Sequence, residues 1–185
     1  MAGPLSGIRV IELGSLIAGP FCAKTLADFG AEVIKIEPPG EGDPLRKWRR
    51  MRNGTSLWWH VQSRNKKSLT CNLRRPEGQD IVRRLARTAH VVVENFRPGA
   101  LEKWHLGWKE LSAENPKLVM VRISGYGQSG PYKERPGFAA IAEGMGGFRY
   151  VNGFPDRPPA RPNLSIGDTI ASFHGVMGAL MALRE

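Results

Sequence analysis

The chain has 185 residues, of which 41% are hydrophobic and 24% are charged, a balance typical of one soluble globular domain. No apolar run is long enough to cross a bilayer, and the N-terminus resembles neither a secretory signal nor a transit peptide, so we expect a cytoplasmic location. The formal net charge of +10 favours anionic partners, without choosing among nucleic acids, phosphorylated cofactors and membrane surfaces.

The first part of the chain predicts a β-α-β unit. Residues 7–13 form a short apolar run that indicates a buried strand, and Pro20 suits the first turn of a helix that continues to Phe29. Gly30 suits the C-terminal cap of that helix, and residues 31–37 predict a second strand. This spacing favours parallel pairing through a right-handed crossover.

Strands and helices continue to alternate along the rest of the chain. The further predicted strands are residues 68–73, 90–96 and 118–124. The predicted helices are residues 76–89 and the run after Asp168, and residues 101–111 are expected to be helical or broken-helical. This alternation predicts an α/β fold, a Rossmann-like and largely parallel sheet with flanking helices. Ligands of such sheets bind beyond the carboxyl ends of the strands, so the loops that follow the strands are candidate site segments.

Cysteine and histidine spacings predict no metal site. The two cysteines, Cys22 and Cys71, show no CxxC spacing, and we expect both to be reduced. The four histidines are scattered along the chain without the spacing of metal ligands.

A basic segment at residues 46–52 contains Trp48 and is followed by Trp58 and Trp59. Basic and aromatic side chains together can bind single-stranded nucleic acid, but no signature of a known nucleic-acid-binding motif accompanies them. A solvated charged face is the commoner fate of such a run. We expect neither a nucleic-acid nor a membrane partner. Oligonucleotide binding by this basic and aromatic segment is kept as an alternative hypothesis.

Asp168 stands where a Pro-rich segment gives way to an apolar, helix-forming run. No other acidic residue lies between Asp156 and Glu185. An aspartate before such a run is most often an N-cap that accepts hydrogen bonds from free backbone N–H groups. The local pattern therefore favours a capping role, and only the rest of the chain can indicate another.

Six segments occur in an order that is specific to one protein family. They are residues 18–20, 30–37, 65–68, 93–99, 123–131 and 167–168. With this ordered set the sequence resembles the class III coenzyme A-transferases, the family of formyl-CoA transferase and the carnitine CoA-transferases. The resemblance runs from about Leu5 to the last residue. It implies the N-terminal part of an interlocked-dimer fold, in which residues 1–185 form the large domain and stop before the small domain and the C-terminal return.

The resemblance implies transfer of coenzyme A from an acyl-CoA thioester to a carboxylic acid. Asp168 matches the family's catalytic aspartate, which forms a mixed anhydride and then an aspartyl-CoA thioester. Coenzyme A is then a substrate, and no permanently bound cofactor is expected. The implied partners are an acyl-CoA, a carboxylic acid and a second copy of the chain. A nucleophilic Asp168 should keep at least one carboxylate oxygen open to a cleft.

The resemblance also implies contacts to coenzyme A. The matching positions without a basic side chain are Ile17, Ala18, Cys71, Asn72, Leu73, Asn95 and Phe96, and the basic ones are Arg74, Arg97, Lys103 and Arg135. Coenzyme A carries three phosphates, which makes the four basic side chains chemically sensible partners. Candidates for the acyl pocket are Trp48, Trp58, Trp59 and Met145, although core packing is the commoner role of such residues.

Two alternatives to transfer stay open. The family also contains 2-methylacyl-CoA racemases, which need a histidine where this chain has Phe138, and the loss of that proton carrier favours transfer over racemisation. The second alternative is a non-catalytic chain that binds coenzyme A without turnover, because family members are considerably longer.

Overall fold

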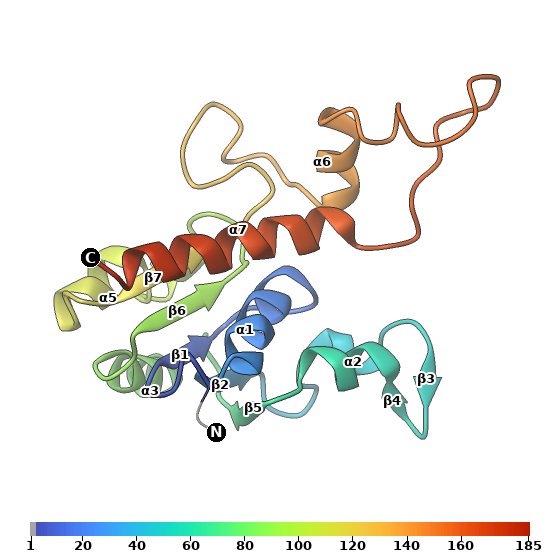
Figure 1. Cartoon of the computed structure of the whole chain (residues 1–185). Helices are drawn as coiled ribbons and strands as arrows, with labels where there is room; N and C mark the ends of the chain where they lie inside the picture. Colours follow the sequence, from blue (N-terminus) through green and yellow to red (C-terminus); the bar gives the residue numbers. More distant parts are fainter. Residues whose placement is uncertain (1–2) are drawn as a thin grey trace.

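The computed structural model describes residues 3–185 and is built on a five-stranded sheet (Figure 1). Its strands are β1 (Arg9–Glu12), β2 (Glu32–Glu37), β5 (Lys66–Thr70), β6 (Val91–Glu94) and β7 (Val119–Arg122). They lie in the order β5-β2-β1-β6-β7, and each neighbouring pair is parallel. The predicted α/β fold with a largely parallel sheet is confirmed.

Both faces of the sheet are apolar, because helices cover each of them. Val10 of β1 pairs in register with Val33 of β2, and the next residue, Ile11, pairs with Ile34. Successive side chains point to opposite faces, so Val10 belongs to one core and Ile11 to the other. Burial on both faces is typical of parallel sheets, whose crossover connections place helices on either side.

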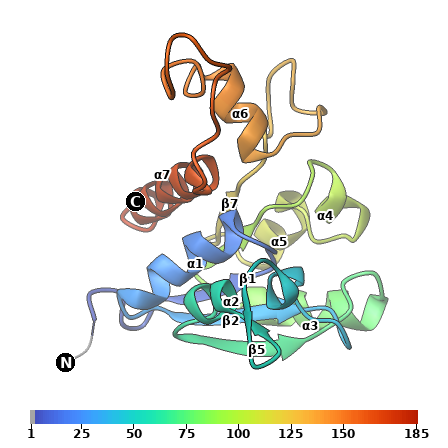
Figure 2. The same cartoon turned by 90° about the vertical axis from the view of Figure 1, so that its right-hand side faces the viewer.

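The helices divide between the two faces. One face is covered by α1 (Ala18–Asp28) and α7 (Ile166–Ala182), and the other by α3 (Pro76–Ala86), α4 (Ala100–Lys103) and α5 (Trp108–Glu114). Figure 2 shows α7 beside α1, with both on the same side of the sheet. No helix within residues 3–185 is long and apolar enough to cross a membrane.

The first β-α-β unit matches its prediction. Pro20 lies in the first turn of α1, and β1 and β2 pair in parallel on either side of that helix in the chain. Gly30 follows the helix with a φ of 102°, a left-handed conformation that costs glycine little. The sequence signal was strong here because the caps and both buried strands agree.

One predicted strand was wrong in its bounds, and one predicted helical segment is broken in two. The strand expected at residues 68–73 is Lys66–Thr70, so Cys71 and the three residues after it lie outside the sheet. The segment expected at residues 101–111 to be helical or broken-helical is broken: it forms two short helices, α4 and α5, separated at His105, whose φ is 53°.

Five short elements were not predicted. They are the 3-10 helix η1 (Pro44–Lys47), β3 (Met51–Arg52), β4 (Thr55–Ser56), α2 (Leu57–Gln62) and α6 (Ala139–Met145). Strands β3 and β4 form a hairpin around Asn53 and Gly54, both with positive φ. Asn-Gly is a strong hairpin signal, so this turn could have been found from the sequence.

Candidate active site

The strand order reverses between β1 and β6, which makes their carboxyl ends the topological switch point of the sheet. The chain leaves β1 toward β2 and β5, whereas it leaves β6 toward β7. A cavity of about 650 Å³ opens at this point, lined by residues 15–18 after β1 and by Asn95 after β6. The structure therefore places a cavity where the sheet topology predicts a ligand site.

Several segments distant in the sequence complete the wall of this cavity. Its other lining residues are Trp48, Arg49, Ile123, Ser124, Gly125, Gly137, Phe138, Ala139, Ala140, Ile141, Ala142, Arg161, Ser165, Gly167, Asp168 and Ala171. The charged residues among them are Arg49, Arg161 and Asp168. None of the four histidines lines it.

Asn95 fixes the loop that follows β1. Its Oδ1 accepts a hydrogen bond from the Ser15 N–H at 2.8 Å, and its Nδ2 donates to the Ser15 carbonyl at 2.9 Å. A Cβ added to Gly14 or Gly19 would lie 2.5 or 2.8 Å from that same Oδ1, so both positions require glycine. The implied coenzyme A residue Asn95 thus lines the cavity and also holds its floor.

Asp43 holds the same loop from the other side. Its Oδ1 accepts hydrogen bonds from the backbone N–H groups of Leu16, at 3.1 Å, and Leu45, at 2.8 Å. Leu16 has a φ of 63°, a left-handed conformation that costs a residue with a Cβ about 1–2 kcal/mol. The surrounding hydrogen bonds keep this strained residue in the cavity wall.

Four buried charges lie beneath the loop. The Lys35 Nζ is 2.7 Å from both the Glu12 Oε1 and the Asp43 Oδ2 and also donates to the Gly14 carbonyl. The Lys66 Nζ is 2.6 Å from the Glu12 Oε2. Burial opposes the charge on Lys35, but the two carboxylates outweigh it and raise the pKa of Lys35. Each buried charge is therefore paired, as burial requires.

Asp168 lies in the first turn of α7, but not where an N-cap would stand. The helix begins at Ile166, and Ser165 occupies the N-cap position without a side-chain hydrogen bond to the helix. The predicted capping role of Asp168 is therefore wrong. The Ser172 hydroxyl lies 2.6 Å from the Asp168 carbonyl and 2.7 Å from that of Ala18, which ties the starts of α7 and α1 together.

The Asp168 carboxylate is half-buried and faces the cavity. Within residues 3–185 no other residue donates a hydrogen bond to it. Burial raises the pKa of Asp168, the nearby Glu143 raises it further, and Arg161 opposes this. The structure thus meets the condition that a nucleophilic Asp168 keeps an oxygen open to a cleft.

Gly167 allows α7 to approach α6 closely. A Cβ at this position would lie 2.9 Å from the Cβ of Ala139, closer than real Cβ contacts come. The Gly167-Asp168 pair therefore combines a packing requirement with a carboxylate on the cavity wall.

The implied coenzyme A positions fall into two groups. Ile17, Ala18 and Asn95 share the cavity with Asp168, whereas the remaining positions do not line it. These are Cys71, Asn72, Leu73, Arg74, Phe96, Arg97, Lys103 and Arg135.

Local packing accounts for several positions of the second group. Cys71 is buried with its Sγ 3.2 Å from the Gly78 carbonyl, and burial raises the pKa of its thiol. Phe96 packs edge-on against Trp104, with ring centroids 5.3 Å apart.

The four implied phosphate contacts are exposed and follow the carboxyl ends of strands. Arg74 comes after β5, Arg97 and Lys103 come after β6, and Arg135 comes after β7. None of the four forms an ion pair with a residue in the described part of the chain. The Arg135 guanidinium lies 4.1 Å from the Tyr132 ring centroid.

The basic segment 46–52 is not a uniform charged face. Arg46 makes two hydrogen bonds to Glu37, of 2.7 and 2.9 Å, and stacks 3.8 Å from the centroid of the buried Trp59. Trp48 and Arg49 instead line the Asp168 cavity. Sequence reasoning proposed Trp48 for an acyl pocket but did not single out Arg49 or Arg161, because their proximity to Asp168 depends on the tertiary fold.

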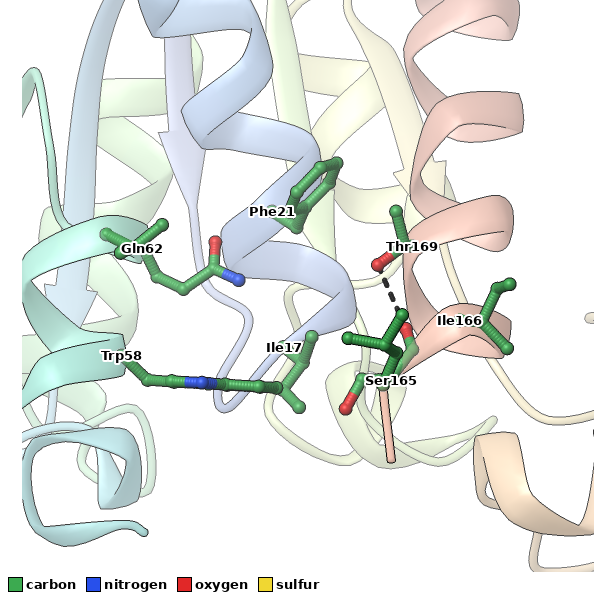
Figure 3. Close-up of a pocket in the computed structure, with 9 residues that line it drawn as sticks. Ile17, Phe21, Trp58, Gln62, Ser165, Ile166 and Thr169 are labelled. Atoms are coloured by element: carbon green, nitrogen blue, oxygen red, sulfur yellow. Dashed lines mark hydrogen bonds between the residues drawn. The ribbon is translucent and has the colours of Figure 1, made fainter. Parts of the chain in front are cut away.

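A second, smaller cavity of about 390 Å³ adjoins the first, because Ile17 and Ser165 line both. Its walls are largely apolar and come from α1, α2 and α7. Figure 3 shows Trp58 and Gln62 on one side and Ile166 and Thr169 on the other. Of the proposed acyl-pocket residues, Trp58 lines this cavity, whereas Trp59 and Met145 line neither.

Comparison with known proteins identifies the family. Residues 5–185 match the family model described as CoA-transferase family III. The chain belongs to CoA-transferase family III. This membership confirms the resemblance inferred from the six ordered motifs.

Named relatives in family III are CoA-transferases. A succinyl-CoA–D-citramalate CoA-transferase of Chloroflexus aurantiacus is 58% identical over 183 residues, which cover 98% of this chain and 46% of the relative. The beta subunit of a succinyl-CoA–L-malate CoA-transferase of the same organism is 49% identical over 184 residues, with 98% and 45% covered.

A solved structure supports the same family assignment. The crystal structure of a CaiB/BaiF family protein from Brucella suis matches with a TM-score of 0.94 and 39% identity, covering 100% of this chain and 50% of that one. The chain spans about half the length of the relatives it matches.

Proposed function

We propose that the protein transfers coenzyme A from an acyl-CoA thioester to a carboxylic acid, with Asp168 as the nucleophile. The observation that carries this proposal is the Asp168 carboxylate, which lies in the wall of the switch-point cavity without a hydrogen bond from another residue of the described chain. A carboxylate that few donors stabilise is more basic and a better nucleophile.

The reaction proceeds through two kinds of covalent intermediate, mixed anhydrides and an aspartyl-CoA thioester. The Asp168 carboxylate attacks the thioester carbonyl, the C–S bond breaks, and a mixed anhydride and the CoA thiolate form. The thiolate then attacks the aspartyl carbonyl and releases the first acid, which carries away one Asp168 oxygen. The acceptor carboxylate reverses these steps, leaves one of its own oxygens on Asp168 and departs as the new thioester.

The start of α7 offers donors for the tetrahedral oxyanions. Ser165 provides no side-chain cap, and the backbone N–H groups of Ile166 and Gly167 have no hydrogen-bond partner within residues 3–185. The positive end of the helix dipole lies at the same place. We assign oxyanion stabilisation to these N–H groups.

We further propose that the acyl donor and the acceptor are dicarboxylic acids. Both Chloroflexus relatives are named for succinyl-CoA, and their named acceptors, citramalate and malate, are dicarboxylic acids. Phe138, where a racemase of this family would need its histidine, lines the cavity, and no histidine of residues 3–185 does. This supports transfer over racemisation.

The remaining parts of the proposal concern coenzyme A and assembly. Arg74, Arg97, Lys103 and Arg135 bind its phosphates, a role supported by their exposure and their lack of ion pairs in the described chain. Residues 1–185 form the large domain of an interlocked homodimer that acts in the cytoplasm. Light scattering of the protein at the full length its gene encodes should give the mass of a dimer, and a monomer would contradict this.

An exchange assay tests the function. We expect the protein, expressed at the full length its gene encodes, to move label from isotopically labelled succinate into succinyl-CoA, and the Asp168→Asn variant to lose this exchange. Binding of succinyl-CoA without exchange would instead support the non-catalytic alternative. Binding of neither thioester nor coenzyme A would contradict both.

A further inference from the structure

We propose that Arg49 is a specificity-determining residue that binds the distal carboxylate of a dicarboxylic acyl group while its thioester faces Asp168. This inference rests on the proposed transferase function and adds a recognition residue to it. Arg49 and Asp168 line the same cavity, one cation and one carboxylate among three charged residues of its wall.

The other cation of the wall already has a carboxylate beside it. The Arg161 Nε lies 3.7 Å from the Glu143 Oε2, and Glu143 is buried. Arg49, in contrast, forms no ion pair within residues 3–185. A substrate that brings one further negative charge into this cavity therefore finds its free cation at Arg49.

Two tryptophans hold the Arg49 guanidinium. Its Cζ lies 4.5 Å from the ring centroid of Trp58 and 5.6 Å from that of Trp48. The two rings pack edge to face, with centroids 6.1 Å apart. Stacking on aromatic faces restrains a guanidinium and leaves its N–H edges available, which suits two-point binding of a carboxylate.

The backbone of Arg49 is also unusual. Its φ is 60°, a left-handed conformation that disfavours any residue with a Cβ. Such conformations persist where the surrounding structure fixes them and gather at functional sites. Leu16, another wall residue of this cavity, has the same conformation.

The pair Trp48 and Trp58 also explains how an acyl chain would reach Arg49. Trp48 lines the Asp168 cavity. Trp58 lines the neighbouring apolar cavity, which Figure 3 shows. The guanidinium thus lies beside apolar surface, where methylene groups are accommodated and a charge at the end of the chain needs a partner.

Two unreactive thioethers of coenzyme A test the proposal. S-(3-carboxypropyl)-CoA places a carboxylate where succinyl-CoA has one, S-butyl-CoA lacks it, and neither can acylate Asp168. Calorimetric titration of the full-length protein should show tighter binding of the carboxylate form, by about tenfold. Arg49→Gln should abolish this preference and leave the affinity for S-butyl-CoA unchanged, whereas Arg49→Lys should keep part of it.

Arg50 provides the matched control, because it is the adjacent exposed arginine and lines neither cavity. Arg50→Gln should retain the full preference. A preference that survives in Arg49→Gln, or is lost only in Arg161→Gln, would overturn the proposal. An equal loss for both thioethers would also overturn it, since Arg49 would then bind the coenzyme itself. Failure of the unmodified protein to bind either thioether would instead contradict the proposed function.

Discussion

Helices α1 and α6 both line the Asp168 cavity, but α1 buries its apolar residues whereas α6 exposes them. Eight of the 11 residues of α1 are buried, among them Leu26, which is fully inaccessible. In α6 the only buried residue is Glu143, while Ile141 and Met145 are 44% and 59% exposed.

The same contrast extends to the regions around these helices. The sheet and its helices form two apolar cores and pair their buried charges. A second region, residues 138–168, leaves Phe138, Tyr150 and Phe154 between 70% and 87% exposed. The sheet region thus contains the two apolar cores, whereas the second region contributes Asp168, the proposed nucleophile, and much of the cavity wall.

The largest expected effect is on activity, from Asp168→Asn. We expect exchange to fall at least about a thousandfold, because covalent catalysis is lost. Exchange by the unmodified protein should also fall as the pH drops through the raised pKa of Asp168. Exchange retained by the variant would contradict the assignment of the nucleophile to the second region.

The same variant should not lose stability. An acid whose pKa is raised on folding binds its proton more tightly in the folded state, so its ionised form at neutral pH opposes folding. Removing that charge should raise the unfolding free energy measured in urea. A marked destabilisation would show that Asp168 is a structural residue.

The next largest effect should come from Glu12→Gln in the buried charge cluster. Lys35 and Lys66 would both lose a carboxylate within 2.7 Å. We expect the unfolding free energy to fall by about 3–5 kcal/mol. The exposed Glu77 provides a control, and Glu77→Gln should change the urea midpoint little.

A pair of truncations compares the two regions directly. Leu26→Ala should cost about 2–5 kcal/mol, because it opens a cavity in the core beneath α1. Tyr150→Ser should change the unfolding free energy by no more than about 0.5 kcal/mol, because 87% of Tyr150 is exposed. Comparable losses in the two variants would show that the second region also stabilises the fold.

The smallest marked loss of stability is expected from the acid dependence due to Glu37. Burial opposes its charge, but hydrogen bonds from Arg46, Ser68 and the Asp43 N–H outweigh this and lower the pKa of Glu37 from 4.5 to about 2. Its contribution is complete above pH 4.5 and is lost as the pH falls toward 2. With allowance for solvent screening, we expect the unfolding free energy of the unmodified protein to fall by about 2 kcal/mol over this pH range. Urea unfolding of Glu37→Gln at the same pH values should not show this fall.

The sheet could be predicted from the sequence because its signals are local. Buried strands such as Val91–Glu94 contain a continuous apolar run, here Val91 to Val93, and Gly30 marks the end of a helix within four residues of the next strand. The short helices η1, α2 and α6 could not, because they are too few turns long to show a period.

The site was only partly predictable for a related reason. Asp168, Ile17, Ala18 and Asn95 follow from motifs, and the fold brings these four together. The proximity of Arg49 and Glu143 to Asp168 depends on how the hairpin and α6 pack, which no sequence spacing encodes.

The transfer of oxygen tests the central claim most directly. When the acceptor acid carries ¹⁸O in its carboxylate, each turnover by the proposed route leaves one acceptor oxygen on the nucleophile. Peptide mass spectrometry after multiple turnovers in unlabelled water should find ¹⁸O in the peptide that contains Asp168, at the Asp168 side chain. Turnover without ¹⁸O in that peptide, or with ¹⁸O at another carboxylate, would contradict the assignment of Asp168 as the nucleophile.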